Sequence, residues 1–487
     1  MAAEADLLVL GAGPAGLAAA WRAARRGQSV LVLERAENTG GMAASFEIAG
    51  MSVDYGSHRL SPATPPHILA DLRALLGADL QTRYRTGRIL LSDRWVTYPF
   101  KPRELAKALP RAPRTRVALD ALSMLRPKAP DAAEASYADL MRAGFGPTLY
   151  QLVYEPYARK LWGVSGDELD ADQARRKAGA PTAFAALTRA VRAGLAGESL
   201  AYLYPRRGFG QLTETLADAA ITAGARIALG TTVERIELHE QGATVTAARS
   251  ESHSAAAERA GRRSAEPWTN GGTVRAKHVF STLPLPQLAR LLVPSAPYEA
   301  LAAASELRFR ALLLVYAVHE GGRWSGHDVH YLPSPAAPVT RISEPANHRI
   351  NPDDPSDRSV ICFEIPCQVG DELWSADERQ LADLVQRTVS ACALPPLRLA
   401  WVQVKRLRHG YPVHNAGYRD HLAALESWID TLPRLTTLGR QGLFTPDNVH
   451  HALDMGYQAA DALGSDAFDH ERWQASRREF TAHLIET

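Results

Sequence analysis

The 487-residue sequence has few cysteines, almost no net charge and no long hydrophobic run. Its three cysteines (Cys362, Cys367 and Cys392) are too few and too irregularly spaced for a disulfide framework or a metal site, so we expect buried, reduced thiols and no bound metal. A formal net charge of +2 does not favour nucleic acid or an anionic membrane as a partner. No apolar run approaches the ~20 residues of a membrane helix, and the first residues are acidic rather than basic. The sequence therefore predicts a cytoplasmic protein without a signal peptide or transmembrane segment.

The N-terminal region follows a strand–helix–strand pattern. The short apolar run Leu7–Leu10 is typical of a parallel strand that is buried on both faces. An alanine-rich, helix-like stretch, Leu17–Arg26, follows it, and a second apolar run, Ser29–Leu33, ends at Glu34. Together these segments predict a β-α-β unit of an α/β fold.

Three glycines join the first strand to the helix in the pattern Gly11-x-Gly13-x-x-Gly16. Gly11 permits a tight turn, Gly13 lets a pyrophosphate approach the backbone, and Gly16 lets the helix pack closely on the strand. The N-terminus of the following helix favours the anion. Glu34, at the end of the second strand, is placed to accept hydrogen bonds from ribose hydroxyls. The pattern therefore predicts a dinucleotide-binding site.

The segment after Glu34 indicates which dinucleotide to expect. Gly40-Gly41-Met42-Ala43-Ala44-Ser45 resembles a segment of the flavin-dependent family that contains amine oxidases, protoporphyrinogen oxidases and UDP-galactopyranose mutases. In that family a Gly-Gly pair wraps the FAD phosphates, and an arginine often stands where this chain has Met42. The resemblance implies FAD as the cofactor, with Arg35, Gly40, Gly41 and Met42 at its binding site.

Two later segments extend the resemblance to most of the chain. Residues 232–236 resemble the strand whose backbone, at Val233, holds the adenine. Residues 438–442 precede a helix-like run, and the resemblance places Gly439 and Arg440 near the pyrophosphate. Asn448 and Val449, just before that run, complete the FAD contacts that the resemblance implies.

The candidate substrate residues follow from a resemblance to the mutases. His58 stands in Tyr55-Gly56-Ser57-His58, which resembles a loop that lies against the flavin. Arg310 matches a cation that binds the substrate diphosphate, and Tyr411 matches a mutase tyrosine. His450 is expected near the pyrimidine edge of the flavin. The other candidates lie in motifs that line the mutase cleft: Tyr98, Tyr157, Lys160 and Trp162.

These residues leave two reactions open. Mutases carry a tyrosine pair after the Gly-Arg motif, where this chain has Pro446 and Asp447, and no second arginine matches securely. An oxidase or dehydrogenase needs only a C–H bond held over flavin N5. We therefore predict an FAD-dependent oxidoreductase that transfers a hydride from a small molecule to flavin N5. The alternative is a redox-neutral sugar mutase that uses reduced FAD as a nucleophile.

The sequence gives less information about a role without catalysis, the substrate and the oligomeric state. The presence of every phosphate-binding glycine disfavours a protein that binds flavin without catalysis. A small-molecule substrate is expected, a sugar or nucleotide sugar among the options, and a homodimer is left open. The catalytic candidates are His58, Arg310, Tyr411 and His450.

The predicted architecture is a GR2-type, Rossmann-like FAD-binding domain with a helical cap and an antiparallel-sheet substrate domain. The FAD domain is expected to be discontinuous, built from residues 1–65, 201–300 and 416–487. Residues 66–200 are predicted to form a mainly helical cap that includes a hairpin at 88–98, and residues 301–415 the antiparallel sheet. Residues 249–272, rich in Ser, Arg, Ala and Gly, predict a flexible hairpin insertion.

Overall fold

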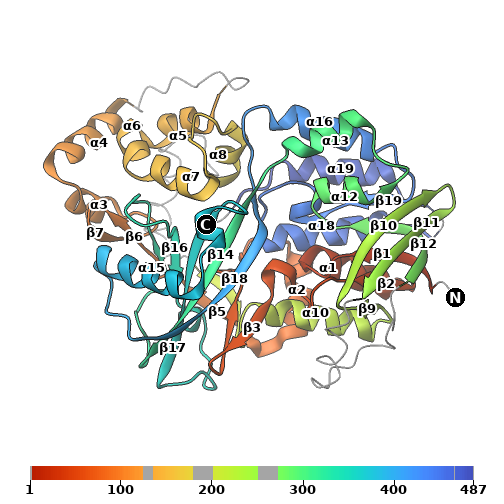
Figure 1. Ribbon diagram of the computed structural model, residues 1–487, viewed down its shortest axis with the longest axis horizontal. Coiled ribbons are helices and arrows are strands. Elements are labelled where there is room, and N and C mark those ends of the chain that lie inside the picture. The colour runs from red at the N-terminus through yellow and green to blue at the C-terminus, as the bar shows by residue number, and fades with distance from the viewer. Residues whose placement is uncertain (1–2, 124–134, 179–200, 250–271, 466, 486–487) are drawn as a thin grey trace.

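The computed structural model describes residues 3–123, 135–178, 201–249, 272–465 and 467–485 (Figure 1). Its larger sheet has eight strands, seven of them in the order β13-β10-β11-β12-β1-β2-β9, with β19 pairing to β12. The strands of this sheet are β1 (Ala3–Leu10), β2 (Val30–Leu33), β9 (Arg226–Ala228), β10 (Thr231–His239), β11 (Gly242–Arg249), β12 (Gly272–Ser281), β13 (Leu292–Val293) and β19 (Leu435–Thr437). Three distant stretches of the chain therefore share one sheet.

The core of this sheet is parallel. β1 pairs in parallel with β2 on one side and with β12 on the other, and all four residues of β2 are buried. Burial on both faces explains why both strands are continuous apolar runs rather than alternating ones. The antiparallel β11 and β12 are described up to Arg249 and from Gly272. Most of the predicted hairpin insertion therefore lies outside the described residues.

Helix α1 (Pro14–Arg25) follows the glycine turn and packs along α18 (Val449–Ala462). Gly456 makes this close approach possible, because a Cβ there would lie 2.4 Å from the Ala15 carbonyl oxygen. Helices α2 (Pro66–Leu76), α10 (Gly210–Thr222) and α19 (His470–Phe480) complete this layer around a core rich in alanine and leucine. The N-termini of α1 and α18 are thus brought to the same region of the molecule.

The second sheet has seven strands in the order β18-β14-β17-β16-β15-β6-β7. They are β18 (Leu399–Pro412), β14 (Phe309–Glu320), β17 (Arg358–Cys367), β16 (Arg341–Ser343), β15 (Val329–Tyr331), β6 (Arg88–Leu91) and β7 (Arg94–Thr97). Helix α15 (Glu378–Ala391) packs on one face. Its pairings are antiparallel except for that of β15 with β6.

The hairpin of β6 and β7 is the main departure from the predicted layout. The sequence placed it in the helical cap, whereas it forms the edge of this sheet. Ile89, Leu91 and Val96 are buried with Val329 and Tyr331 of β15, and this apolar contact holds the hairpin on the sheet. The partner strand lies some 240 positions along the chain, so local patterning could not indicate it.

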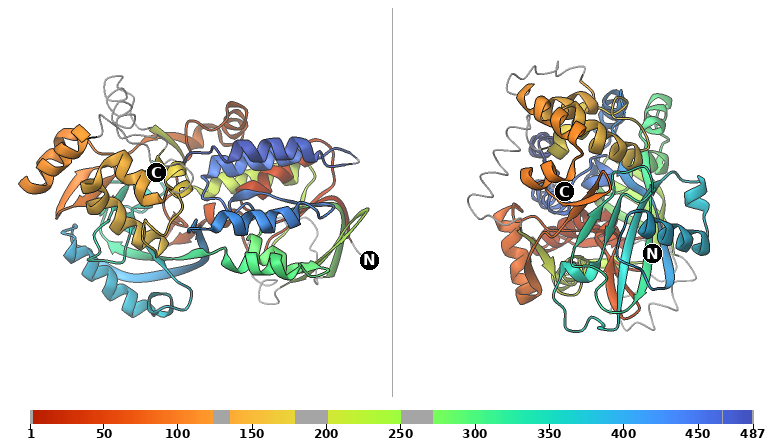
Figure 2. Two further views of the ribbon diagram at one scale, coloured as in Figure 1. Left: turned by 90° about the horizontal axis from the view of Figure 1, so that it is seen from above. Right: turned by 90° about the vertical axis from the view of Figure 1, so that its left-hand side faces the viewer.

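A further group of helices forms a layer over one end of the second sheet, at the upper left of Figure 1. They are α3 (Pro102–Ala108), α4 (Arg111–Ser123), α5 (Tyr137–Phe145), α6 (Pro147–Leu149), α7 (Glu155–Trp162) and α8 (Ala171–Ala178), with a π-helical turn at Tyr150–Tyr154. Residues 124–134 and 179–200 of the predicted helical cap lie outside the described residues. Figure 2 shows these helices and the second sheet at one end of the molecule, and α1 and α18 at the other. No described helix has the length and apolar character that a membrane crossing requires.

Candidate cofactor and substrate site

One large cavity of about 2510 Å³ runs from the glycine turn before α1 to the cap helices. Single ligand sites usually occupy ~300–1,000 Å³. The cavity therefore has room for a dinucleotide and a second molecule together. Its cofactor end is lined by residues around Gly13, Glu34 and Gly439, and its substrate end by residues around Tyr157 and Arg341.

The three glycines of the turn differ in what surrounds them. Gly11 has φ +102°, and a Cβ there would lie 2.2 Å from Thr282 Oγ1. A Cβ on Gly16 would lie 2.0 Å from the Gly11 carbonyl oxygen, so Gly16 serves packing and does not line the cavity. A Cβ on Gly13 would meet no atom within 4 Å, and Gly13 does line the cavity. The open space beside Gly13 is the cradle that a pyrophosphate would need.

The carboxylate of Glu34 lies at the cavity wall and holds the glycine turn. The backbone N–H of Ala12 donates to Glu34 Oε2 at 2.7 Å, and that of Ala36 donates to Oε1 at 2.8 Å. The exposed Arg35 also lines the cavity here. Glu34 is thus fixed at the end of β2, where a ribose would lie, and its ribose contact remains a prediction.

Two further backbone segments converge on the same turn. Gly439 has φ +79°, and a Cβ there would lie 3.0 Å from Ala15 Cβ and 3.8 Å from Thr282 Cβ. A Cβ on Gly41 would lie 3.4 Å from Gly13 Cα. Because Gly11 and Gly439 both border Thr282, one pyrophosphate could contact both loops. Gly40, with φ +109°, turns the chain and does not itself line the cavity.

Arg440 provides a cation at this end of the cavity. Its guanidinium carbon lies 5.2 Å from the centroid of the Tyr411 ring, and its Nε is buried without a hydrogen-bond partner among the described residues. Burial lowers the pKa of Arg440. A buried arginine without an ion pair to a described carboxylate fits an anionic cofactor. Four other predicted cofactor residues also line the cavity: Met42, Val233, Asn448 and Val449.

His58 lies farther along the cavity wall, stacked on the ring of Phe209 with ring centroids 5.1 Å apart. Its Nδ1 has no hydrogen-bond partner among the described residues. Burial is the main reason that the pKa of His58 is lowered, so the imidazole is neutral at pH 7. Four other predicted residues join it at the wall: Tyr98, Tyr157, Trp162 and Tyr411.

The most prominent ion pair in the cavity wall was not predicted from the sequence. Arg341 Nε donates to Glu364 Oε1 at 2.8 Å and Arg341 Nη2 to Oε2 at 2.6 Å, while the Ser57 N–H donates to Oε1 at 2.9 Å. Glu364 is 1% exposed and stands opposite Arg341 in the β16–β17 ladder. The pair therefore fixes the loop that carries His58. A lone acidic residue in the apolar run of β17 was the signal that could have indicated it.

A second unpredicted pair joins Arg59 to the buried Asp328, with Arg59 Nη2 2.9 Å from Asp328 Oδ2. The Arg59 guanidinium also lies 5.2 Å from the centroid of the Tyr202 ring. Arg59 lines the cavity beside His58. The loop after β4 (Met51–Asp54) is thus tied on both sides of His58, through Ser57 to Glu364 and through Arg59 to Asp328.

Three of the predicted catalytic and substrate residues do not line the cavity. Arg310 Nη1 donates to Gln368 Oε1 at 3.1 Å, and a Cβ on Gly163 would lie 2.8 Å from that Nη1, so Arg310 is packed behind the end of α7. Lys160 Nζ donates to the backbone carbonyl of Ser334 at 2.9 Å, and burial lowers its pKa to about 7. Arg310 and Lys160 are therefore held by other protein groups in this structure, and their contact with a substrate remains a prediction.

His450 is the third residue away from the wall. It is buried in α18 with its ring centroid 4.0 Å from that of His451. Burial lowers the pKa of His450 to about 3, so it is neutral at physiological pH. Its side chain packs beside His451 at the start of the helix, and its place near the flavin edge remains a prediction.

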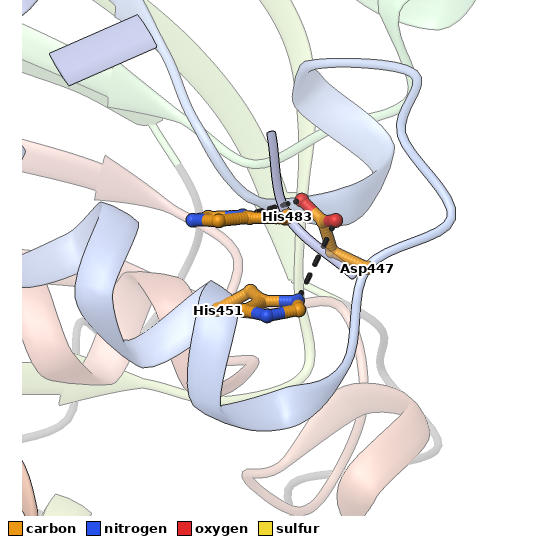
Figure 3. A group of neighbouring side chains, drawn as sticks. All are labelled: Asp447, His451 and His483. Atoms are coloured by element: carbon orange, nitrogen blue, oxygen red, sulfur yellow. Dashed lines mark hydrogen bonds and ion pairs between the residues drawn. The ribbon is translucent and has the colours of Figure 1, made fainter. Parts of the chain in front are cut away.

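Asp447 lies at the cavity wall with two histidines, His451 and His483 (Figure 3). Its carboxylate lies 3.6 Å from His451 Nδ1, 3.4 Å from His483 Nδ1 and 3.4 Å from Arg176 Nη1. Burial raises the pKa of Asp447, but the histidine hydrogen bonds and Arg176 outweigh it and hold that pKa well below its usual range.

The same three side chains bring one potential metal-ligand atom each within 4.8 Å of the others. However, the rings of His451 and His483 stack 4.0 Å apart at an interplanar angle of 11°, and the Nδ1 atom of each already contacts the Asp447 carboxylate. Arg176 already opposes the carboxylate charge. A hydrogen-bonded network centred on Asp447 explains this arrangement better than a metal ion.

The chain belongs to the family of flavin-containing amine oxidoreductases, whose profile matches residues 14–463. Over 258 residues it is 28% identical to a Mycobacterium tuberculosis protein provisionally assigned as a flavin-containing monoamine oxidase, covering 50% of this chain and 53% of that protein. It is 38% identical over 89 residues to the putrescine oxidase of Kocuria rosea, 18% of each chain. The chain thus spans about half, or less, of the length of the curated relatives that it matches.

Solved structures show the same fold over nearly the whole chain. A reduced UDP-galactopyranose mutase aligns with a TM-score of 0.78 at 18% identity, covering 99% of this chain and 100% of the mutase. A putrescine oxidase bound to putrescine aligns with a TM-score of 0.63 at 18% identity, covering 95% and 99%. The predicted family, the GR2-type α/β fold class and FAD as the cofactor are confirmed.

Proposed function

We propose that this protein is an FAD-dependent oxidoreductase that oxidises an uncharged or anionic small molecule rather than an amine. The observation that carries the proposal is the state of the carboxylates at the cavity wall. An ammonium substrate is best bound by a carboxylate that is free to receive it. Among the described residues, every acidic group that lines the cavity already has partners.

Three carboxylates line the cavity, those of Glu34, Glu364 and Asp447. Glu34 accepts two backbone N–H groups, and Glu364 accepts both Arg341 and the Ser57 N–H. Asp447 is held by Arg176 and two histidines. Taking any of these groups for a substrate ammonium would break a buried, charge-assisted interaction.

The basic groups at the cavity wall also disfavour an amine substrate. They outnumber the carboxylates, and even with an FAD diphosphate bound the excess is positive. The arginines that line the cavity are Arg35, Arg59, Arg85, Arg114, Arg341, Arg406, Arg408 and Arg440. A positive lining repels a cationic amine and tolerates a neutral or anionic ligand.

The described residues supply the other requirements of a dehydrogenation. Bound FAD supplies the acceptor for the hydride that leaves a substrate carbon. The neutral imidazole of His58 can take the proton that leaves the neighbouring atom, so that a double bond forms between the two atoms. Tyr157 and Tyr411 enclose the space beside it. Dioxygen or another two-electron acceptor must then remove the two electrons.

The sugar mutase is the second candidate, and one observation favours it. The alignment with the mutase structure covers essentially the whole chain, and Tyr157, Trp162 and Tyr411 lie at the wall as the resemblance implies. Against it, Arg310 is bonded to Gln368 and does not line the cavity. Pro446 and Asp447 also stand where mutases carry hydroxyl donors. The oxidoreductase therefore ranks first.

An anaerobic spectral experiment tests the choice. The oxidised holoenzyme is mixed with alcohols, hydroxy acids, amines and nucleotide sugars, and the oxidised-flavin absorbance and the products are followed. Bleaching by a non-amine, reversed by air or an added acceptor, is the expected result. Bleaching by amines alone would overturn the substrate class. Turnover only after the flavin is first reduced, with no acceptor consumed, would establish the mutase instead.

A further inference from the structure

Helix α4 presents an apolar stripe to the cavity. Val117, Ala118, Ala121 and Leu122 line it at the spacing of one helical face, with Arg114 at the polar end of the same face. A surface helix normally gains its stability by burying such a stripe against a protein core. No residue of α4 is buried among the described residues, and Leu122 is 63% exposed. The stripe therefore faces a space that the described protein leaves open.

Residues of the neighbouring cap elements that line the cavity are also apolar. Phe145, at the end of α5, Leu149 in α6 and Val153 in the π-helical turn line the same cavity. Their elements are tied to α4, because the Thr148 N–H donates to Asp120 Oδ2 at 2.9 Å. We call the space bounded by Val117, Ala118, Ala121, Leu122, Phe145 and Leu149 the apolar annex.

The annex is continuous with the place where oxidation would occur. The same cavity extends past Tyr98 and Tyr157 to His58 and the Arg341–Glu364 pair. Its lining thus changes from charged and aromatic at the flavin end to aliphatic at the cap end. A molecule that fills both ends has a polar reacting part and an apolar body.

We propose that the substrate is an amphiphile whose reacting polar end lies near His58 and whose apolar chain or ring system fills the annex. This inference rests on the proposed function, since it takes the occupant of the cavity to be the molecule that is oxidised. The volume supports it: about 2510 Å³ exceeds what a dinucleotide and a compact second ligand of ~300–1,000 Å³ each would occupy. The affinity of the ligand then rises with every methylene group that it buries against the aliphatic wall.

Binding of n-alkanoic acids of increasing chain length to the FAD-loaded protein tests the annex directly. Isothermal titration calorimetry below the micelle concentration should show an affinity that rises ~3–4-fold for each added methylene until the annex is full. In Ala118→Asp the rise should fall to less than ~2-fold per methylene, because a carboxylate then stands in the aliphatic wall. Ala121→Trp, which fills the annex, should stop the rise at a shorter chain.

Ala112→Asp is the matched control, because Ala112 lies on the same helix, is exposed and does not line the cavity. It should keep the wild-type dependence on chain length. An equal loss in Ala112→Asp and Ala118→Asp, or no dependence in the wild type, would overturn the annex. So would a dimer in sedimentation that Ala118→Asp abolishes, since the stripe would then be a contact between two copies.

The failures of the two proposals can be told apart. Binding of alkanoates requires no turnover, so a steep dependence on chain length without oxidation of any non-amine contradicts the oxidoreductase and supports the annex. Rapid oxidation of short, polar substrates that longer homologues do not improve supports the oxidoreductase and contradicts the annex.

Discussion

The two ends of the cavity differ in whether backbone or side chains form most of the wall. The cofactor end consists largely of backbone: the turns at Gly11, Gly13, Gly41 and Gly439, held by the single carboxylate of Glu34. The substrate end consists of side chains from the second sheet and the cap, joined in pairs such as Arg341–Glu364. A backbone site tolerates changes in side chains but not the addition of a Cβ. A side-chain site fails when one partner of a pair is removed.

Breaking the buried pair at the substrate end should produce the largest effect. In Glu364→Gln, Arg341 keeps its charge without a counter-charge, and loss of one partner of a buried ion pair costs ~3–5 kcal/mol. We expect an unfolding free energy lower by that amount and a large loss of turnover, measured by denaturant unfolding and steady-state kinetics.

Glu344→Gln is the control for that variant. Glu344 is equally buried, at 1% exposure, and accepts the Trp324 and Ser325 N–H groups, but it forms no ion pair with a described arginine. Its substitution should lower the unfolding free energy by only ~1–3 kcal/mol. Equal costs in the two variants would mean that the charge pair adds nothing to the substrate end.

At the cofactor end, Gly13→Glu should give the next largest effect. Its Cβ has free space, so the apoprotein should fold, but a carboxylate would stand where the FAD diphosphate approaches. Like charges this close cost several kcal/mol, so FAD affinity should fall ~100-fold. Flavin content after gel filtration measures the loss of FAD affinity, and the melting temperature of the apoprotein shows whether the variant still folds.

Gly326→Glu is the matched substitution outside this cavity, because a Cβ on Gly326 also meets no atom within 4 Å. It should leave the flavin content unchanged. If Gly13→Glu retained FAD as Gly326→Glu does, the glycine turn would not be the pyrophosphate site.

The smallest expected effect is on the pH dependence of the unfolding free energy, and it concerns the buried His348. Burial lowers the pKa of His348 to about 3, so the folded protein holds it neutral while the unfolded chain takes up a proton near pH ~6.5. Its contribution to stability is complete above that pH and is lost as the pH falls toward 3, at no more than ~1.4 kcal/mol per pH unit.

His348→Phe should therefore flatten the loss of stability below pH ~6.5. The change in unfolding free energy between pH 7.5 and 5.5, compared with the wild type, measures it. Loss of the contact between His348 Nδ1 and the Tyr202 hydroxyl, at 3.2 Å, lowers the stability of the variant at both pH values and cancels in this comparison. An unchanged slope would show that His348 is not held neutral.

Short-range patterns carried the predictions at the cofactor end. The glycine turn, Glu34 and the buried strands β1 and β2 lie within 34 residues, and their geometry follows from local backbone rules. Gly439 and Arg440 were also found, because the Gly-Arg segment resembles a known motif and precedes a helix. The GR2-type α/β fold and FAD could therefore be predicted from the sequence.

The substrate end depended on contacts between distant strands. Arg341 and Glu364 meet only because β16 and β17 pair in one register, and the Arg310 guanidinium lies against Gly163, far along the chain. Neither contact could be predicted from a local sequence pattern. The hairpin of β6 and β7 likewise joins the second sheet through a partner in β15.

The sequence by itself indicated a dinucleotide and the glycine turn expected to hold it, because phosphate binding needs particular glycines at fixed spacing within one turn, and the family resemblance indicated FAD. Tertiary structure alone decided which side chains line the cavity and where the apolar stripe of α4 points. Side-chain direction at a cavity wall depends on strand register and on helix packing, and both are fixed by burial summed over the whole chain.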